Sequence, residues 1–326
     1  MAGGQWAVAG DGGYLGHSQL SKQIRDQVQG MGRLDQFAVP IDKSKTIGRG
    51  NGDTVLFDRM DLITDAAGKV SETDTIPESE MPVTQGSLVI SEWGIKIPFT
   101  GRLEALAQFS PSNIYHRGLI KSQVKAFDLE CATLLRTGKI VYSMTGTAGA
   151  GAGTWSYDGT DPVTATRDLD LGDIRALVEK AKSLHIEPMD DDGNYVAVIP
   201  PGGVRAIQND SEWRDAQNYN RTGRIFNGEI GEAYGARFVE ENLTMLNVIN
   251  AGNDKSELFL LGRDALAKGI VIAPEIRSDT PTDLGRHKTV GWYGMVGYAL
   301  VWNDHTATEA GADGKARFLR VESAAS

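Results

Sequence analysis

The chain has 326 residues with a formal net charge of −10 at pH 7, and it contains 39 glycines, 11 prolines and one cysteine, Cys131. The negative charge argues against a protein whose main task is to grip nucleic acid, because that affinity comes from neutralising phosphates with Lys and Arg. The single cysteine excludes intrachain disulfides and Cys-based structural metal sites. The start has no signal-peptide pattern, and no apolar run approaches the roughly 18 residues that span a bilayer. We therefore expect a soluble, unexported protein made in a reducing cytoplasm.

The first hundred residues predict an arm followed by a long hairpin. Residues 1–40 are rich in Gly and Gln, with one short periodic stretch. Residues 53–60 (DTVLFDRM) and 87–99 (SLVISEWGIKIPF) have the composition of strands. The connection between them, 61–86, has six acidic residues against Lys69 alone, a net charge of −5. Because so long a connection without its own structure is uncommon in a compact domain, we expect a protruding acidic hairpin.

The clearest helix is expected from Ser110 to Gly138. Ser110 suits the N-cap, a proline follows at the first helical position, and Gly138 suits the C-terminal cap. Apolar residues four, three, four and three positions apart predict one narrow buried stripe, formed by Ile120, Val124, Phe127, Cys131 and Leu134. At ~1.5 Å per residue this rod is about 40 Å long. With Lys139 just after it, the rod carries five basic and two acidic residues, a net charge of +3.

The second half predicts a compact α/β or α+β domain. A Gly-Ala tract at 145–154 indicates a linker or surface loop, and Asp170 and Asp173 begin a second amphipathic helix that reaches Leu184. The strands expected after it cover 195–199, 237–241, 246–249, 258–262 and 316–322. The run 290–302 has large apolar residues on both faces, so it is expected to be a central strand. A turn containing Asp313-Gly314 follows it.

No pattern in the sequence predicts catalytic, cofactor-binding or metal-binding residues. The glycine clusters at 10–16 and 149–153 lack the third glycine and the strand-loop-helix context of a dinucleotide loop. The five histidines are scattered singly, and the Asp-rich run 190–193 lacks the ligand spacing and closing Glu of a calcium loop. We interpret these features as loops and turns and expect no enzymatic activity, although a cytosolic nucleotide-binding enzyme is a remaining, less favoured hypothesis.

The order of elements and four sequence segments resemble those of the major capsid proteins of tailed bacteriophages. The segments are GDTVLF at 52–57, ALVEKAKSLHIEPMDDDGNYVAVIPPG from Ala176, SEWRDAQNY from Ser211 and NGEIGEAYGARFVEEN from Asn227. They are most similar to a capsid family found in some short-tailed phages. The resemblance implies an α+β Hong Kong 97-like capsid fold with an N-terminal arm, an extended two-stranded loop, a long spine helix and a mixed α/β axial domain.

The resemblance also implies boundaries for these parts. The arm covers 1–40 and the extended loop 41–100. The peripheral domain covers 101–167, with its spine helix at 111–138. Residues 168–285 contain most of the axial domain, and 286–326 form C-terminal strands that return to the peripheral domain. Because the arm is short and lacks a coiled-coil segment, the resemblance favours a separate scaffolding protein over a fused one.

The resemblance implies that function is carried by contacts between copies of the chain. We expect a shell of hexamers and pentamers around double-stranded phage DNA, which the acidic wall binds only weakly. The portal is a further expected partner, a decoration protein is a possible one, and no membrane contact is expected. Assembly is expected in the host bacterial cytoplasm. The alternative within the fold is an encapsulin-type nanocompartment. The residues expected at intersubunit contacts are Glu78 and Glu80 in the acidic hairpin, Arg117, Lys121 and Lys125 on the basic helix, and Lys43, Lys45 and Arg49 in the basic segment before the hairpin.

Overall fold

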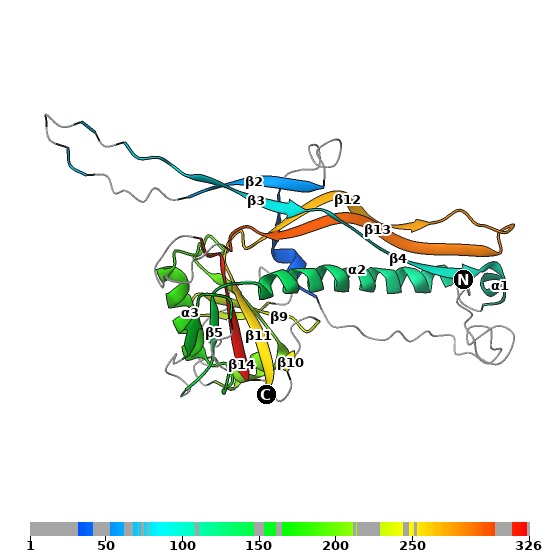
Figure 1. The fold of residues 1–326 in the computed structure, drawn as a ribbon. Helices are drawn as coiled ribbons and strands as arrows, with labels where there is room; N and C mark the ends of the chain where they lie inside the picture. Colours follow the sequence, from blue (N-terminus) through cyan, green and yellow to red (C-terminus); the bar gives the residue numbers. More distant parts are fainter. Residues whose placement is uncertain are drawn as a thin grey trace.

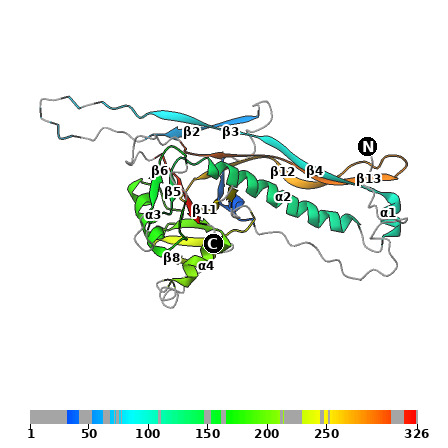
Figure 2. The ribbon, with the colours of Figure 1, turned by 60° about the horizontal axis from the view of Figure 1, so that its bottom comes forward.

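The computed structural model describes residues 32–41, 53–61, 68–70, 72, 75–76, 78–107, 111–146, 153–160, 165–210, 213, 229–243, 248–250, 253–303 and 315–324. The molecule is elongated, with a compact lobe at one end (Figure 1). The long helix α2 (Pro111–Arg136) runs from the other end toward this lobe, alongside a narrow sheet. A two-stranded hairpin crosses the sheet and projects past the lobe, as the turned view in Figure 2 also shows.

The compact lobe is built on a mixed eight-stranded sheet in the order β6-β5-β14-β11-β7-β9-β8, with β10 paired to β11. Its strands are β5 (Val141–Ser143), β6 (Thr154–Ser156), β7 (Tyr195–Ile199), β8 (Glu229–Ala233), β9 (Ala236–Glu240), β10 (Val248–Asn250), β11 (Asn253–Leu261) and β14 (Phe318–Ala324). β5 runs parallel to β14 and β7 parallel to β9, whereas the other pairs are antiparallel. The lobe therefore draws its strands from widely separated parts of the chain.

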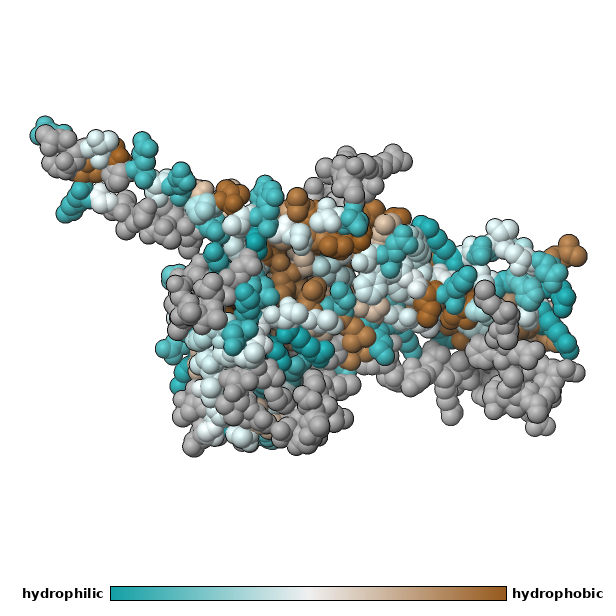
Figure 3. All heavy atoms as spheres, viewed as in Figure 1, coloured by the Kyte–Doolittle hydropathy of each residue, from teal (hydrophilic) through white to brown (hydrophobic). Residues whose placement is uncertain are grey.

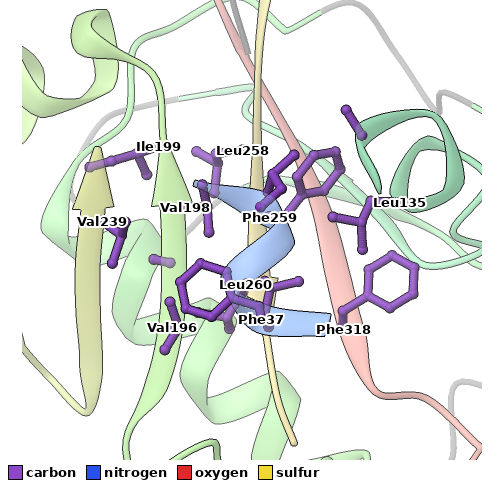
Figure 4. Close-up of a cluster of buried hydrophobic side chains, with 14 of the residues drawn as sticks. Phe37, Leu135, Val196, Val198, Ile199, Val239, Leu258, Phe259, Leu260 and Phe318 are labelled. Carbon is purple, nitrogen blue, oxygen red and sulfur yellow. The ribbon is translucent and has the colours of Figure 1, made fainter. Parts of the chain in front are cut away.

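Helices α3 (Leu171–Ser183) and α4 (Pro201–Asn209) complete the lobe. α3 begins where the sequence predicts, because Asp170 Oδ1 accepts a hydrogen bond from the Asp173 N–H at 2.9 Å and the two residues form a capping box. Every residue of β7 is buried, which confirms the predicted buried strand. Figure 4 shows the core around it, where side chains of β7, β9, β11 and β14 meet Leu135 of α2 and Phe37.

The narrow sheet has four strands in the order β1-β12-β13-β4. They are β1 (Ala38–Pro40), β4 (Ser91–Thr100), β12 (Leu266–Ser278) and β13 (His287–Leu300). β13 pairs with both β12 and β4, so the long apolar run near the C-terminus is a central strand, as predicted. The 3-10 helix η2 (Leu34–Phe37) precedes β1, and α1 (Gly101–Leu106) follows β4, capped by Thr100 Oγ1.

Aromatic side chains hold α2 against this sheet. The ring centroid of Phe127 lies 6.0 Å from that of Trp93 on β4 and 5.7 Å from that of Trp292 on β13. The Tyr298 ring, also on β13, lies 6.0 Å from Phe127. Such edge-to-face and tilted pairs are the favoured arrangements of aromatic rings, so Phe127 fixes the rotation of the helix over the sheet.

The apolar stripe predicted for α2 is correct only in the C-terminal half of the helix. Phe127 and Cys131 are buried, but Ile120 and Val124 are 52 % and 41 % exposed. In the N-terminal half the buried residues are instead Tyr115 and Leu119, with 3 % and 1 % of their surface exposed. The reason is that this half contacts the narrow sheet on one side, whereas the C-terminal half also packs against the lobe.

The helix α2 ends at Arg136, so Gly138 has the position predicted for a cap glycine but not the conformation. Gly138 does not have the positive φ of a C-terminal cap glycine. A Cβ atom at this position would lie 2.5 Å from Phe318 Cε2, so the glycine is needed to let the Phe318 ring pack against the helix end. The expected N-cap, Ser110, lies outside the described residues.

Sheet membership differs from the segment boundaries expected from the sequence. Residues 139–167 were grouped with the long helix, but β5 and β6 belong to the sheet of the lobe. Conversely, β12 belongs to the narrow sheet although it lies within 168–285. β14 lies within 286–326, which was expected to return to the peripheral domain, and it pairs with β11 and β5 in the sheet of the lobe. The chain passes between the two sheets repeatedly, and the local periodicity of the sequence does not predict to which sheet a strand belongs.

Candidate assembly surfaces

The hairpin consists of β2 (Thr54–Met60) and β3 (Val83–Val89), paired antiparallel from Thr54↔Val89 to Met60↔Val83. The Asp61 N–H extends the ladder by donating to Pro82 O at 3.0 Å. The second strand therefore begins four residues before the expected Ser87. We call residues 61–82, of which 61, 68–70, 72, 75–76 and 78–82 are described, the hairpin tip.

The base of the hairpin is locked onto the narrow sheet. Leu88 is fully buried in a small core formed with Ile90, Ala267 and Ala299. Leu88 lies over two glycines of the sheet: a Cβ atom on Gly269 would be 2.9 Å from Leu88 Cδ2, and one on Gly297 would be 2.7 Å from the same atom. The hairpin can cross here only because these positions lack side chains.

Arg59 makes a second attachment, on the inner face of β2. Its guanidinium donates to Val301 O at 3.1 Å and lies 4.7 Å from the centroid of the Trp302 ring. It also donates to Gln85 O on β3 at 3.3 Å. The base of the hairpin is thus fixed in direction, and the tip projects from a rigid support.

The outer face of the hairpin is exposed and carries four apolar side chains between polar ones. Side chains alternate across the ladder, and those that point away from the sheet include Leu56 and Met60 of β2, and Val83 and Val89 of β3. Between 54 % and 69 % of the surface of each is exposed. Figure 3 shows hydrophobic residues on the surface along the hairpin and the adjoining sheet. Exposed apolar clusters of this kind mark sites of contact with other molecules.

Apart from the half-buried Asp61, the described part of the hairpin tip is also exposed. Glu78 and Glu80, two of the predicted contact residues, are both exposed. Apolar side chains stand beside them, with Ile76 73 % and Met81 52 % exposed. The contact residues predicted in this segment are both charged, although its apolar residues were also a visible signal in the sequence.

The basic contact residues predicted on α2 share one row of the helix. Arg117, Lys121 and Lys125 are four residues apart, so they lie one above another on the helix surface. Arg117 and Lys125 are exposed and Lys121 is half-buried. The exposed Ile120 and Val124 border this row, so the surface combines three cations with two apolar side chains.

These two predicted groups do not meet within one subunit. Figures 1 and 2 both place the hairpin tip beyond the compact lobe, whereas the N-terminal half of α2 lies at the opposite end of the molecule, near α1. Lys43, Lys45 and Arg49 lie outside the described residues. The structure therefore brings Arg117, Lys121 and Lys125 together, and separates them from Glu78 and Glu80.

The Asp-rich run at 190–193 is used inside the subunit. Asp190 Oδ2 lies 2.5 Å from the Nε atom of the buried Arg237, and Gly193 makes the turn with φ +86°. Among the described residues, no group of three His, Cys, Asp or Glu side chains could hold a metal ion. Within that same part of the chain, no helix is long and apolar enough to cross a membrane.

Comparisons with known proteins relate this architecture to virus shells. A family model described as phage capsid protein matches residues 123–309, which is more than half of the chain. The structure is similar to a chain from the capsid of Ralstonia phage GP4, with a TM-score of 0.67 and 12 % identity over 98 % of each chain. It is also similar to a chain from the capsid of cyanophage Pam1, with a TM-score of 0.67 and 15 % identity over 100 % of this chain and 99 % of the other.

A third similar structure is the head of Helicobacter pylori bacteriophage KHP40, with a TM-score of 0.64 and 11 % identity over 94 % of each chain. No curated protein matches the sequence. At these identities the likeness to solved structures concerns the fold, and the fold is that of phage shell subunits. The family match goes further: the chain belongs to the phage capsid protein family. It is a major capsid protein, a structural component of the virion shell.

Proposed function

We propose that the shell closes through a contact between the hairpin tip of one subunit and the exposed face of α2 on a neighbour. The observation that carries the proposal is the position of these two surfaces at opposite ends of one chain, where they cannot satisfy each other. A contact between different patches on identical subunits is heterologous, and such contacts generate rings when the rotation between neighbours closes. Repeated in hexamers and pentamers, they form an icosahedral shell around double-stranded DNA.

Charge and apolar surface both match across the proposed contact. The tip carries Glu78 and Glu80, and the helix row carries three basic side chains. Exposed ion pairs contribute only about 0–1 kcal/mol each, so they orient the contact and do not supply most of its free energy. Burial of apolar surface supplies more, at about 25 cal/mol per Å². Ile76 and Met81 on the tip, against Ile120 and Val124 on the helix, offer that surface.

We also propose which part of a capsid fold each part of this chain forms. We assign the hairpin as the extended loop of a Hong Kong 97-like fold, and α2 with the narrow sheet as its peripheral domain. The compact lobe is the axial domain, and it includes β5, β6 and β14 in addition to most of 168–285. Lys43, Lys45 and Arg49 remain proposed as further basic contacts from the segment before the hairpin.

The weak binding of DNA is proposed from charge, and the other partners are those that the resemblance to phage capsid proteins implies. A net charge of −10 supports a wall that repels packaged DNA more than it binds it. We propose a separate scaffolding protein, a portal, and in some particles a decoration protein as further partners, with assembly in the bacterial cytoplasm and no catalytic activity. The family match favours a phage shell over an encapsulin-type compartment or a nucleotide-binding enzyme.

Charge reversal tests the proposed contact. Glu78→Lys with Glu80→Lys should strongly reduce the yield of shells, since like charges then face each other across the contact. Lys121→Glu with Lys125→Glu should do the same. Mixing the two double variants should restore assembly wherever a reversed tip meets a reversed helix. Shell yield is measured by sedimentation and negative-stain electron microscopy.

Glu179→Lys is the matched control, because Glu179 is an exposed acid on α3 of the compact lobe, away from both surfaces. It should assemble like the unmodified protein. Normal assembly of all the reversed variants would refute the hairpin-to-helix contact while leaving the family assignment intact.

A further inference from the structure

An ionic junction holds the first described segment of the chain, residues 32–41, which we call the anchor segment, onto α2 and the narrow sheet. Asp35 of η2 accepts from Lys268 Nζ of β12 at 2.6 and 2.8 Å, and from the Tyr298 hydroxyl of β13 at 2.6 Å. The Asp35 backbone N–H donates to Oδ1 of Asp128 on α2 at 3.0 Å. The junction therefore ties together four elements that are far apart in the sequence.

Asp128 is an unusual residue in this junction, because its carboxyl is buried while one of its oxygens has no partner. Its exposed fraction is 1 %. Oδ2 is buried and accepts no hydrogen bond from the described part of the chain. A Cβ atom on Gly32 would collide with this oxygen, so the backbone of the anchor segment lies directly against it. A cavity of about 270 Å³ opens beside the carboxyl, lined by Arg33, Gln123 and Val124 among others.

Charged and titratable groups face Asp128 from each element packed around it. They are Arg33 and Asp35 of the anchor segment, Glu241 after β9, Lys268 of β12, Tyr298 of β13, and Glu130 and Cys131 of α2 itself. Two of the closest are carboxylates, and the ammonium of Lys268 is already bonded to one of them. An ionised Asp128 thus adds a third carboxylate to a site with little spare positive charge.

The pKa of Asp128 reflects this environment, since it is raised from 3.8 to about 6. Burial is the largest cause of the raised pKa. The hydrogen bond from the Asp35 N–H opposes it, repulsion from Glu241 and Asp35 raises the pKa further, and the backbone N–H of Leu34 opposes this rise to a smaller extent. Burial and the neighbouring carboxylates also raise the pKa of the Tyr298 hydroxyl and of the Cys131 thiol. Asp128 therefore changes charge between mildly acidic and neutral conditions.

We propose that the Asp128 carboxyl is a proton-operated latch that holds the anchor segment firmly on α2 when protonated and loosely when ionised. Protonation removes one of three like charges and turns an oxygen without a partner into a neutral hydroxyl. When the anchor segment detaches, Asp128 becomes solvent-exposed and returns to an ordinary carboxyl. The closed state then binds the proton more tightly than the open state. The equilibrium therefore shifts toward the attached anchor segment as pH falls through about 6, and toward the detached one as pH rises.

The size of the effect follows from the pKa values of the two states. With 3.8 in the open state and about 6 in the closed state, raising the pH from 5.0 to 7.5 increases the opening equilibrium about tenfold. Hydrogen exchange of peptides within 32–41, corrected for intrinsic rates, measures this opening on the full-length protein. α3 serves as an internal reference, since its amides should show no such change.

Asp128→Asn keeps the shape of the side chain and removes its titration. The hydrogen-exchange protection of the anchor segment in this variant should therefore be the same at both pH values, and close to that of the unmodified protein at pH 5.0. Glu179→Gln, which changes an exposed acid on α3 outside the junction, is the control and should keep the tenfold dependence. A flat profile in the unmodified protein, or an undiminished pH dependence in Asp128→Asn, would overturn the proposal.

Glu241→Gln provides a second test that is independent of how well Asp128→Asn folds. Removing this like charge should move the midpoint of the pH-dependent protection to lower pH. A midpoint that stays in place or moves upward would contradict the repulsion on which the latch depends.

Discussion

Gly297 shows how single residues determine the course of the hairpin. The carbonyl oxygen of Val89 approaches Gly297 so closely that no Cβ atom fits, and the Leu88 side chain covers the same position. Gly297→Ala should lower the free energy of unfolding of the unassembled subunit by about 1–3 kcal/mol, because either β3 or β13 must shift. Chemical denaturation measures the loss, and faster hydrogen exchange in β3 locates it.

Gly118 is the matched glycine for this test, since it lies in α2 and no atom of the described residues is within 4 Å of an added Cβ atom. Gly118→Ala should stabilise the subunit by about 0.5–1 kcal/mol through helix propensity alone. If the two substitutions had equal effects, the close approach at Gly297 would not be what restricts the hairpin.

Some single-residue properties could be predicted from the sequence and others could not. Cys131 was expected to pack on the apolar stripe, and it is fully buried. The contact between Asp35 and Asp128 joins residues 93 positions apart, and neither has a local pattern that indicates its partner. Gly138 was assigned to a cap because its place in the sequence fits one, whereas its actual partner, Phe318, comes from the other end of the chain.

At the scale of elements, α2 has buried residues that stabilise the subunit and exposed residues that we assign to the contact between subunits. Substitutions on the same helix should therefore affect either folding or assembly. Leu119→Ala should cost about 2–5 kcal/mol of unfolding free energy, because Leu119 is buried against the narrow sheet. Val124→Ala should change it by less than about 0.5 kcal/mol in the unassembled subunit, because Val124 is 41 % exposed. Denaturation of the subunit and light scattering during shell formation measure the two effects.

The Val124 substitution should nevertheless slow or reduce shell formation, because it removes apolar surface from the proposed contact. A large loss of subunit stability from Val124→Ala would mean that this face is covered within the chain. Unchanged assembly would mean that the face is not part of a contact.

Elements with strong local signals were predicted well. The long helix, the capping box at Asp170 and the buried strand β7 depend on neighbouring residues, which the sequence displays directly. Whether Ile120 and Val124 are buried depends on which elements pack against them, and the helical period of the sequence does not indicate this. The sheet to which β5, β6, β12 and β14 belong depends on the path of the whole chain.

At the scale of the whole molecule, the subunit carries surfaces that its own fold does not cover. The hairpin is firmly attached at its base through Leu88 and Arg59, yet its outer face and tip remain exposed. The helix presents a basic and apolar face at the far end. A rigid support with an exposed tip is suited to a neighbour, since a fixed direction lowers the entropic cost of association.

Disulfide crosslinking between subunits tests this central claim most directly. Cys131 is fully buried and should not interfere. Glu80→Cys is combined in turn with Arg117→Cys, Lys121→Cys or Lys125→Cys, and assembled shells are oxidised and run on a denaturing, non-reducing gel. Because the two positions lie at opposite ends of one chain, a bond can form only between subunits. We predict a ladder of covalent multimers for at least one pair. Well-formed shells that yield only monomers for all three pairs would contradict the account.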